Sequence, residues 1–391
     1  MPIVISDYNQ QLISFLNSSP TPFHAVEEMG RFLGAQRFAY LPENTPWQLT
    51  AGKSYWTSRE KSALIAFTLA GSTEADTGFR FLAAHTDSPC LQIKPRPEAV
   101  NNGFCQLGVE LYGGPLLNPW FDRDLSLAGR VCGQTADGEL AVLLVDFRRP
   151  LLTIPSVAIH FDREANSGRS INQQQHLPPI LGISQEEQTC NFPALLLARA
   201  REEHPAMELT EILAYDIFCY DSQPAAISGV NGELLSSARL DNLLSCHAGM
   251  RAIADAGNSK NALLFCANHE ENGSRSATGA HSSYIDAVLE RIIPDPGQRR
   301  IALSNSFLVS MDNAHASHPN HPDKMDKAHP IRLNHGPVIK INANQRYVTN
   351  SISAAIFKHL CREAGLTPQE FVMRSDIPCG STIGPITAAR L

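Results

Sequence analysis

Apolar residues recur at helical spacing near the start of the chain and then form short continuous runs. Residues 8–16 are amphipathic, and after a proline-containing break a second helix is expected to end at Gly34. One face of that second helix carries Ala25, Val26, Met29 and Leu33. The runs at residues 62–69 and 79–84 are almost wholly apolar, which is typical of strands covered on both faces of a sheet.

The pattern changes over residues 91–236. Short apolar runs there, such as residues 109–112, 127–131 and 139–145, are separated by Gly, Pro and Asp. This texture predicts antiparallel strands joined by hairpins. We therefore expect this part of the chain to form a separate β-rich domain.

Beyond residue 236 the chain returns to alternating helix and buried strand. A helix is expected over residues 242–254, and buried strands are expected over residues 261–267 and 305–310. The whole pattern predicts an α/β fold with a three-layer αβα catalytic domain around a mixed, largely parallel sheet. Its expected domains are a discontinuous catalytic domain, residues 1–90 and 237–391, and an inserted β-rich assembly domain, residues 91–236.

Composition narrows the class of protein. The 391 residues carry a net charge of −7 at pH 7, so neither nucleic acid nor an anionic membrane is indicated as a partner. No apolar run approaches the roughly 18 residues of a membrane span, and the N-terminus lacks a secretory signal. The nine cysteines include no Cys-x-x-Cys pair, so we expect free thiols and a cytoplasmic protein.

Potential metal ligands follow three of the predicted strands. The strand at residues 79–84 runs into His85 and Asp87, the next into Glu270 and Glu271, and the last into Asp312. The carboxyl ends of parallel strands meet at one edge of a sheet, where sites form. Carboxylate and imidazole ligands without thiolates suit Zn²⁺, Mn²⁺ or Co²⁺.

Each of these clusters also has an ordinary explanation when taken alone. The residues after the first strand could be a turn, the glutamate pair a solvated strand end, and Asp241, which opens the helix at 242–254, a helix cap. The occurrence of all of them together favours a metal site. Adjacent Glu270 and Glu271 further suggest that one binds metal while the other acts on a water molecule.

Several common catalytic motifs are absent. Gly273 stands where a second histidine would complete an HExxH motif after His269, and the chain has no GxSxG elbow, phosphate-binding P-loop or GxGxxG fingerprint. The glycine-rich block at residues 378–385 lacks the Lys-Ser/Thr ending of a phosphate loop. We interpret Cys379 within it as an inert thiol rather than a nucleophile.

The sequence resembles the aspartyl aminopeptidases of the bacterial type, which are two-metal enzymes. The matching blocks follow the order of that family along the whole chain. They are SPTPFHAV (19–26), AHTDSP (84–89), RLDN (239–242), HEE (269–271), GS (273–274), HPN (318–320), GPVIK (336–340), NQRY (344–347) and PCGSTIGP (378–385).

The resemblance implies a set of metal ligands. His85 and Asp312 would hold one ion, Glu271 would hold the second, and Asp241 would bridge the two. Two Zn²⁺ ions per subunit are expected, with Mn²⁺ or Co²⁺ as alternatives. His269, His315 and His318 are expected to be structural or to support the ligands.

The resemblance also implies catalytic and substrate-binding roles. Glu270 would be the general base, and Asp87 would orient His85 in the usual carboxylate–histidine–metal arrangement. Substrate would be contacted by His160, Lys340 and Tyr347. His160 lies in the segment IPSVAIH (154–160), which resembles the family segment that reaches the active site of a neighbouring subunit.

One feature of the family has no counterpart in this sequence. Family members continue for a few dozen residues beyond the PCGSTIGP block and supply there a second histidine for the second metal. The present sequence ends at Leu391, and its last histidine, His359, falls in a predicted helix over residues 353–364. With Glu271 and Asp241 alone we expect weak binding of the second metal, because catalytic zinc sites usually have three protein ligands.

The function implied by the resemblance is that of a cytoplasmic metallo-aminopeptidase. It would remove N-terminal residues, preferably Asp or Glu, from peptides, and it would form a homo-oligomer, which in the family is a dodecamer. Two alternatives stay open: a non-catalytic assembly protein, and a metal-dependent amidase or deacylase on the same core. Retention of Glu270 argues against the first, and the lysine–tyrosine block at residues 336–347 argues against the second.

Overall fold

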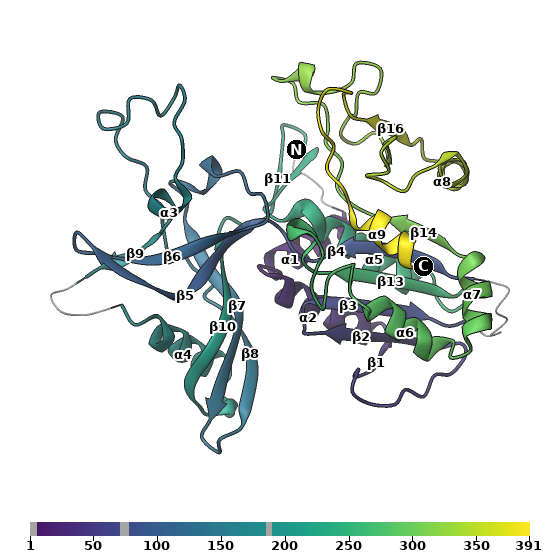
Figure 1. Ribbon diagram of the computed structural model, residues 1–391, viewed down its shortest axis with the longest axis horizontal. Coiled ribbons are helices and arrows are strands. Elements are labelled where there is room, and N and C mark those ends of the chain that lie inside the picture. The colour runs from purple at the N-terminus through teal and green to yellow at the C-terminus, as the bar shows by residue number, and fades with distance from the viewer. Residues whose placement is uncertain (1–5, 71–77, 185–189) are drawn as a thin grey trace. The chain divides into compact units, whose positions relative to one another are not determined.

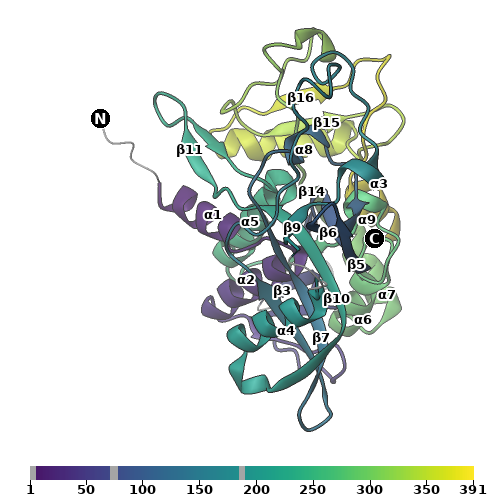
Figure 2. The same cartoon turned by 90° about the vertical axis from the view of Figure 1, so that its left-hand side faces the viewer.

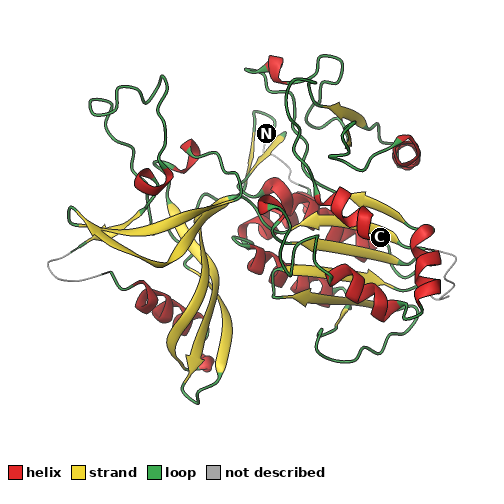
Figure 3. Ribbon diagram, in the orientation of Figure 1, coloured by secondary structure: helices red, strands yellow, loops and turns green. Residues whose placement is uncertain are grey.

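The computed structural model describes residues 6–70, 78–184 and 190–391. The chain forms two compact units, which are residues 33–85 with 244–391, and residues 1–32 with 86–243. The unit that contains the predicted inserted segment thus also includes the N-terminal helices. Figure 3 shows helices and strands mixed in the first unit and mostly strands in the second.

The unit of residues 33–85 and 244–391 is built on a six-stranded mixed sheet. Its strands, in spatial order, are β1 (Ala39–Tyr40), β2 (Ser54–Arg59), β3 (Ala63–Thr68), β13 (Ala262–Ala267), β4 (Arg80–His85) and β14 (Phe307–Ser310). β4 pairs in parallel with both β13 and β14, whereas β3 is antiparallel to its two neighbours. The parallel strands therefore end at the same edge.

Helices cover both faces of this sheet. One face packs against α6 (Tyr284–Ile292), α7 (Pro296–Ser304) and α9 (Ile383–Arg390), as Figure 1 shows. On the other face α5 (Leu240–Asp255) approaches so closely that a Cβ at Gly249 would lie 2.7 Å from a methyl group of Leu264. Covered on both sides, β13 is buried along its whole length, which explains its continuous apolar sequence.

A smaller parallel sheet belongs to the same unit. It consists of β15 (Val338–Ile341) and β16 (Gln369–Val372), with α8 (Ser351–Glu363) between them in the chain and the 3₁₀ turn η5 (Pro322–Lys324) before them. A small apolar cluster forms around Met325, Ile331, Tyr347 and Phe371. This cluster holds the segment that contains Lys340 and Tyr347.

The second unit begins with α1 (Asp7–Asn17) and the start of α2 (Pro22–Ala35) and continues into an antiparallel six-stranded sheet. The strands, in spatial order, are β8 (Leu140–Asp146), β7 (Leu125–Thr135), β10 (Leu209–Asp221), β5 (Cys90–Asn101), β6 (Phe104–Tyr112) and β9 (Ile180–Ile183). Smaller elements are η2 (Asn118–Trp120), α3 (Gln173–His176), η3 (Pro205–Met207) and the hairpin of β11 (Ala226–Ser228) and β12 (Leu234–Ser236).

A helix within the β-rich segment was not predicted. α4 (Phe192–Glu203) runs beside β10 in Figure 2 and buries Phe192, Leu196 and Ala200. Asn191 caps it by accepting a hydrogen bond from the Ala194 amide at 2.9 Å. The apolar spacing and the cap were both present in the sequence.

In the described part of the chain no helix is long and apolar enough to cross a membrane.

Two element predictions differ in detail from the structure. α2 continues through Gly34 to Ala35, because the expected left-handed stop is made instead by Arg37, whose φ is +67°. β14 was expected to be buried but is only half-buried along its length. It is the last strand at its end of the sheet, so among the described strands only β4 pairs with it.

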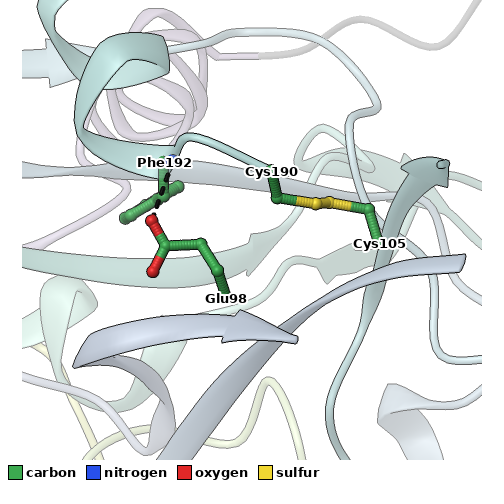
Figure 4. The surroundings of a disulfide bond; sticks show 4 residues. All are labelled: Glu98, Cys105, Cys190 and Phe192. Atoms are coloured by element: carbon green, nitrogen blue, oxygen red, sulfur yellow. Dashed lines mark hydrogen bonds between the residues drawn. A yellow bond between two sulfur atoms is a disulfide. The ribbon is translucent and has the colours of Figure 1, made fainter. Parts of the chain in front are cut away.

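The expectation of free thiols was wrong for one pair of cysteines. Cys105 on β6 and Cys190, just before α4, are joined in a disulfide across a sequence separation of 85 residues (Figure 4). Their Cα atoms lie 6.1 Å apart, a spacing that a disulfide spans. Nearby, Glu98 accepts a hydrogen bond from the Phe192 amide at 3.0 Å. The other cysteines keep their thiols: Cys90, Cys132, Cys219, Cys246, Cys266, Cys361 and Cys379.

Candidate metal centre

The site residues lie just past the ends of the parallel strands. His85 is the last residue of β4 and pairs in register with Ala267, the last residue of β13. Glu270 and Glu271 follow β13 in the 3₁₀ turn η4 (Glu270–Asn272), and Asp312 follows β14 by two residues. The His85 side chain is almost fully buried, and its carbonyl accepts a hydrogen bond from the Cys246 thiol of α5 at 3.0 Å.

Three of the predicted ligands form one group. Ligand atoms of His85, Asp241 and Glu271 all lie within 4.8 Å of one another. Zinc lies about 2.0–2.2 Å from nitrogen and oxygen ligands, so ligand atoms at these separations are close enough to hold metal. The donor set of one imidazole and two carboxylates also suits zinc.

Asp241 enters the group from the start of α5, where the backbone is not helical. The peptide bond between Asp241 and Asn242 is cis. The φ and ψ angles are −83° and 106° at Asp241, and −126° and 27° at Asn242. These angles depart from helical values, so Asp241 and Asn242 precede the regular part of α5.

Asp312 sits between a histidine and a lysine. His85 Nε2 lies 3.8 Å from Asp312 Oδ1, and Lys340 Nζ lies 3.3 Å from Asp312 Oδ2. Burial alone would raise the pKa of Asp312, but the neighbouring His85 and the charge of Lys340 together lower it to about 2. Asp312 is therefore a carboxylate at neutral pH, which is the form that binds metal.

Lys340 and Tyr347, which are both expected to contact substrate, are neighbours. Lys340 Nζ lies 5.5 Å from the centre of the Tyr347 ring and donates to the Asn313 carbonyl at 2.6 Å. Burial raises the pKa of Tyr347, and the Cys379 thiol donates a hydrogen bond to its hydroxyl oxygen at 3.0 Å. Tyr347 is thus a neutral phenol at the pH of the cell.

The structure adds a residue that the sequence did not indicate. Tyr112, at the end of β6, donates a hydrogen bond from its hydroxyl to Asp87 Oδ2 at 2.8 Å. Asp87 is fully buried, so this bond satisfies part of a carboxylate that would be costly to bury alone. No motif links Tyr112 to Asp87, because the strand pairing of β5 and β6 brings them together.

Three other histidines that the sequence analysis considered differ in exposure and in hydrogen bonding. His160 is exposed in a turn of the other compact unit, and His359 is exposed on α8. The ring of His269 is engaged by the hydroxyls of Ser276 and Thr278, at 2.7 Å and 3.2 Å from Nδ1. This engagement fits the structural role expected for His269.

Comparisons with known proteins show which family the chain resembles. The family model described as aminopeptidase I zinc metalloprotease (M18) matches residues 15–391. A "Probable M18 family aminopeptidase 2" from Stutzerimonas stutzeri (strain A1501) is 50% identical over 385 residues, covering 98% of this chain and 89% of that protein.

Solved structures agree with this placement. A chain in the cryo-EM structure of the Ape4 and Nbr1 complex is 37% identical with a TM-score of 0.94, covering 100% of this chain and 80% of that one. The S. cerevesiae mApe1 dodecamer structure is 25% identical with a TM-score of 0.82, covering 98% and 87%. The predicted mixed α/β fold is confirmed. The chain belongs to the M18 family of zinc metalloproteases and is a metal-dependent aminopeptidase.

Proposed function

We propose that this aminopeptidase is of the aspartyl type and hydrolyses peptides with two metal ions per subunit. The observation that carries the proposal is the group of His85, Asp241 and Glu271, with Asp312 within 3.8 Å of His85. His85 and Asp312 would hold one ion, Glu271 would hold the second, and Asp241 would bridge the two. Family membership disfavours both the non-catalytic assembly protein and the amidase alternative.

When bound, the metal ions would polarise the scissile carbonyl, lower the pKa of a water molecule and hold the free α-amine of the peptide. Glu270 would remove a proton from that water and deliver it to the leaving amine. Glu270 begins the same 3₁₀ turn that carries Glu271, so the two carboxylates differ in position by one residue. This arrangement supports a division of labour between base and ligand.

The preference for Asp or Glu at the N-terminus would come from Lys340. Two of its three N–H donors are directed to Asp312 and to the Asn313 carbonyl. The ammonium group still carries its charge beside the ligand Asp312, where an acidic side chain of the substrate would be attracted. The net negative charge of the chain repels an acidic substrate over long distances. At physiological salt, screening beyond about 8 Å weakens this repulsion more than it weakens the short-range attraction to Lys340.

Replacing Lys340 by Met is expected to lower kcat/KM for an Asp arylamide about 10–100-fold more than for a Leu arylamide, because a charge-assisted hydrogen bond is lost. Both rates will also fall somewhat, since Asp312 loses its cationic neighbour. Lys358→Met is the matched control, because Lys358 pairs with Glu370 at 2.6 Å on the surface of α8. Equal losses on both substrates would assign Lys340 to the support of Asp312 alone.

We also propose that residues 91–236 form an assembly domain inserted in a catalytic domain of residues 1–90 and 237–391, and that the enzyme is a cytoplasmic homo-oligomer. One solved relative is titled a dodecamer. Around His160 the apolar side chains of Val157, Ile159 and Phe161 are 54%, 48% and 86% exposed. Such exposure on one short segment is typical of a contact surface.

Replacing Phe161 by Asp is expected to give a smaller assembly with little peptidase activity, because His160 would no longer reach a neighbouring subunit. His160→Gln should lose activity while keeping the size of the assembly. Light scattering combined with an arylamide assay measures both properties. A Phe161→Asp variant that is monomeric and fully active would refute the dependence of activity on assembly.

A further inference from the structure

Arg239 lies two residues before Asp241 and reaches back to the end of the first helix. Its Nε donates to the Ser19 carbonyl at 3.1 Å, and its Nη2 donates to the Leu16 carbonyl at 3.3 Å. Both carbonyls lie at the C-terminal end of α1, where the Leu16 carbonyl also accepts a hydrogen bond from the Ser18 amide. These bonds attach the segment before Asp241 to the end of α1.

The backbone of Arg239 needs such an attachment. Its φ is +60°, a left-handed conformation that residues other than glycine rarely adopt because Cβ crowds the backbone. The guanidinium also lies 5.7 Å from the ring of Tyr220 on β10, which gives it an additional contact. The surrounding structure therefore holds this residue in a turn that the chain alone would not favour.

A second contact holds Asp241 itself. Ser88 Oγ donates to the Asp241 carbonyl at 2.6 Å. Ser88 comes three residues after His85 in the sequence, so this bond joins the backbone of one predicted ligand to the segment that follows another. The backbone around Asp241 is thus held at two points. Arg239 anchors the segment before it, and Ser88 bonds the Asp241 carbonyl.

We propose that Arg239 and Ser88 are positioning residues that set the direction of the Asp241 carboxylate and thereby the affinity of the site for zinc. The inference rests on the proposed role of Asp241 as a ligand. Replacing a residue that orients a metal ligand typically lowers metal affinity about 10–100-fold. A purely structural Arg239 would stabilise the fold through α1 and leave the zinc affinity of folded protein unchanged.

Arg239→Lys keeps the charge but removes the two-point contact, and Ser88→Ala removes the bond to the Asp241 carbonyl. Arg201→Lys is the matched control, because Arg201 Nε donates to the Leu209 carbonyl at 2.7 Å away from the ligands. Zinc affinity would be measured on the full chain by competition with a chromophoric chelator. The unfolding temperature of the metal-free protein would be measured in parallel.

We expect Arg239→Lys and Ser88→Ala each to weaken zinc binding about 10–100-fold, whereas Arg201→Lys leaves zinc binding unchanged. The double variant should lose less than the product of the single losses, since both act on one short segment. Unchanged zinc affinity in folded Arg239→Lys and Ser88→Ala would overturn the proposal. If Arg239→Lys fails to fold, Ser88→Ala decides the question. Unchanged zinc binding in Asp241→Asn would instead refute the proposed function.

Discussion

Replacing Glu270 by Gln is expected to leave zinc bound and to lower kcat about 10²–10⁴-fold, the usual cost of losing a general base. Gln has the shape of Glu but cannot accept a proton from water. Glu270 is half-buried at the start of η4, directly before the proposed ligand Glu271. Because Gln has nearly the size of Glu, the substitution adds no bulk near the proposed metal site. Zinc analysis and steady-state kinetics on the same sample give both quantities.

The matched control is the neighbouring substitution, Glu271→Gln. Because Glu271 belongs to the group of ligand atoms, this variant should lose zinc as well as activity. Comparing the two variants would then separate zinc binding from catalysis. If Glu270→Gln kept both zinc and full activity, the base would have to be another residue.

Replacing Asp241 by Asn should damage both metal sites at once and remove nearly all activity. A neutral amide is a much poorer metal ligand than a carboxylate, and one bridging carboxylate serves both ions in the proposed arrangement. The backbone should keep its place, since Ser88 bonds the carbonyl of residue 241 rather than its side chain. Metal analysis of the purified variant should find less than one zinc ion per subunit.

Asp255→Asn is the control at the other end of the same helix. Asp255 lies 3.8 Å from Arg251 on the surface, at the opposite end of α5 from Asp241, so zinc content and activity should not change. Loss of only one equivalent of zinc from the Asp241→Asn variant would contradict bridging. It would then assign Asp241 to a single ion.

Much of the catalytic unit could be predicted because its strands are buried on both faces. β3 and β13 have almost no polar residue in their interiors, and such runs stand out in any sequence. Polar residues follow directly where each apolar run ends, and the burial of the strands does not account for them. The parallel pairing of β4 with β13 and β14 then required these residues to emerge at one edge.

Contacts between segments far apart in the chain could not be predicted in this way. The pairing of Cys105 with Cys190 spans 85 residues and has no spacing motif. Lys340 could be assigned to substrate by resemblance, but its 3.3 Å approach to Asp312 depends on how β15 is placed. The roles of His160 and of the domain boundaries stay predictions.

By itself, the sequence determined the family and the mixed α/β fold, because local apolar patterns and contiguous motifs carry that information. The residues of the metal site stay predictions. Only the tertiary structure decided which residues contact the candidate site residues and the segments beside them. Tyr112 reaches Asp87 from another strand, and Arg239 reaches the end of α1 across more than 200 residues of chain. A side-chain hydrogen bond imposes no periodicity on a sequence, so such supports become visible only when the chain is folded.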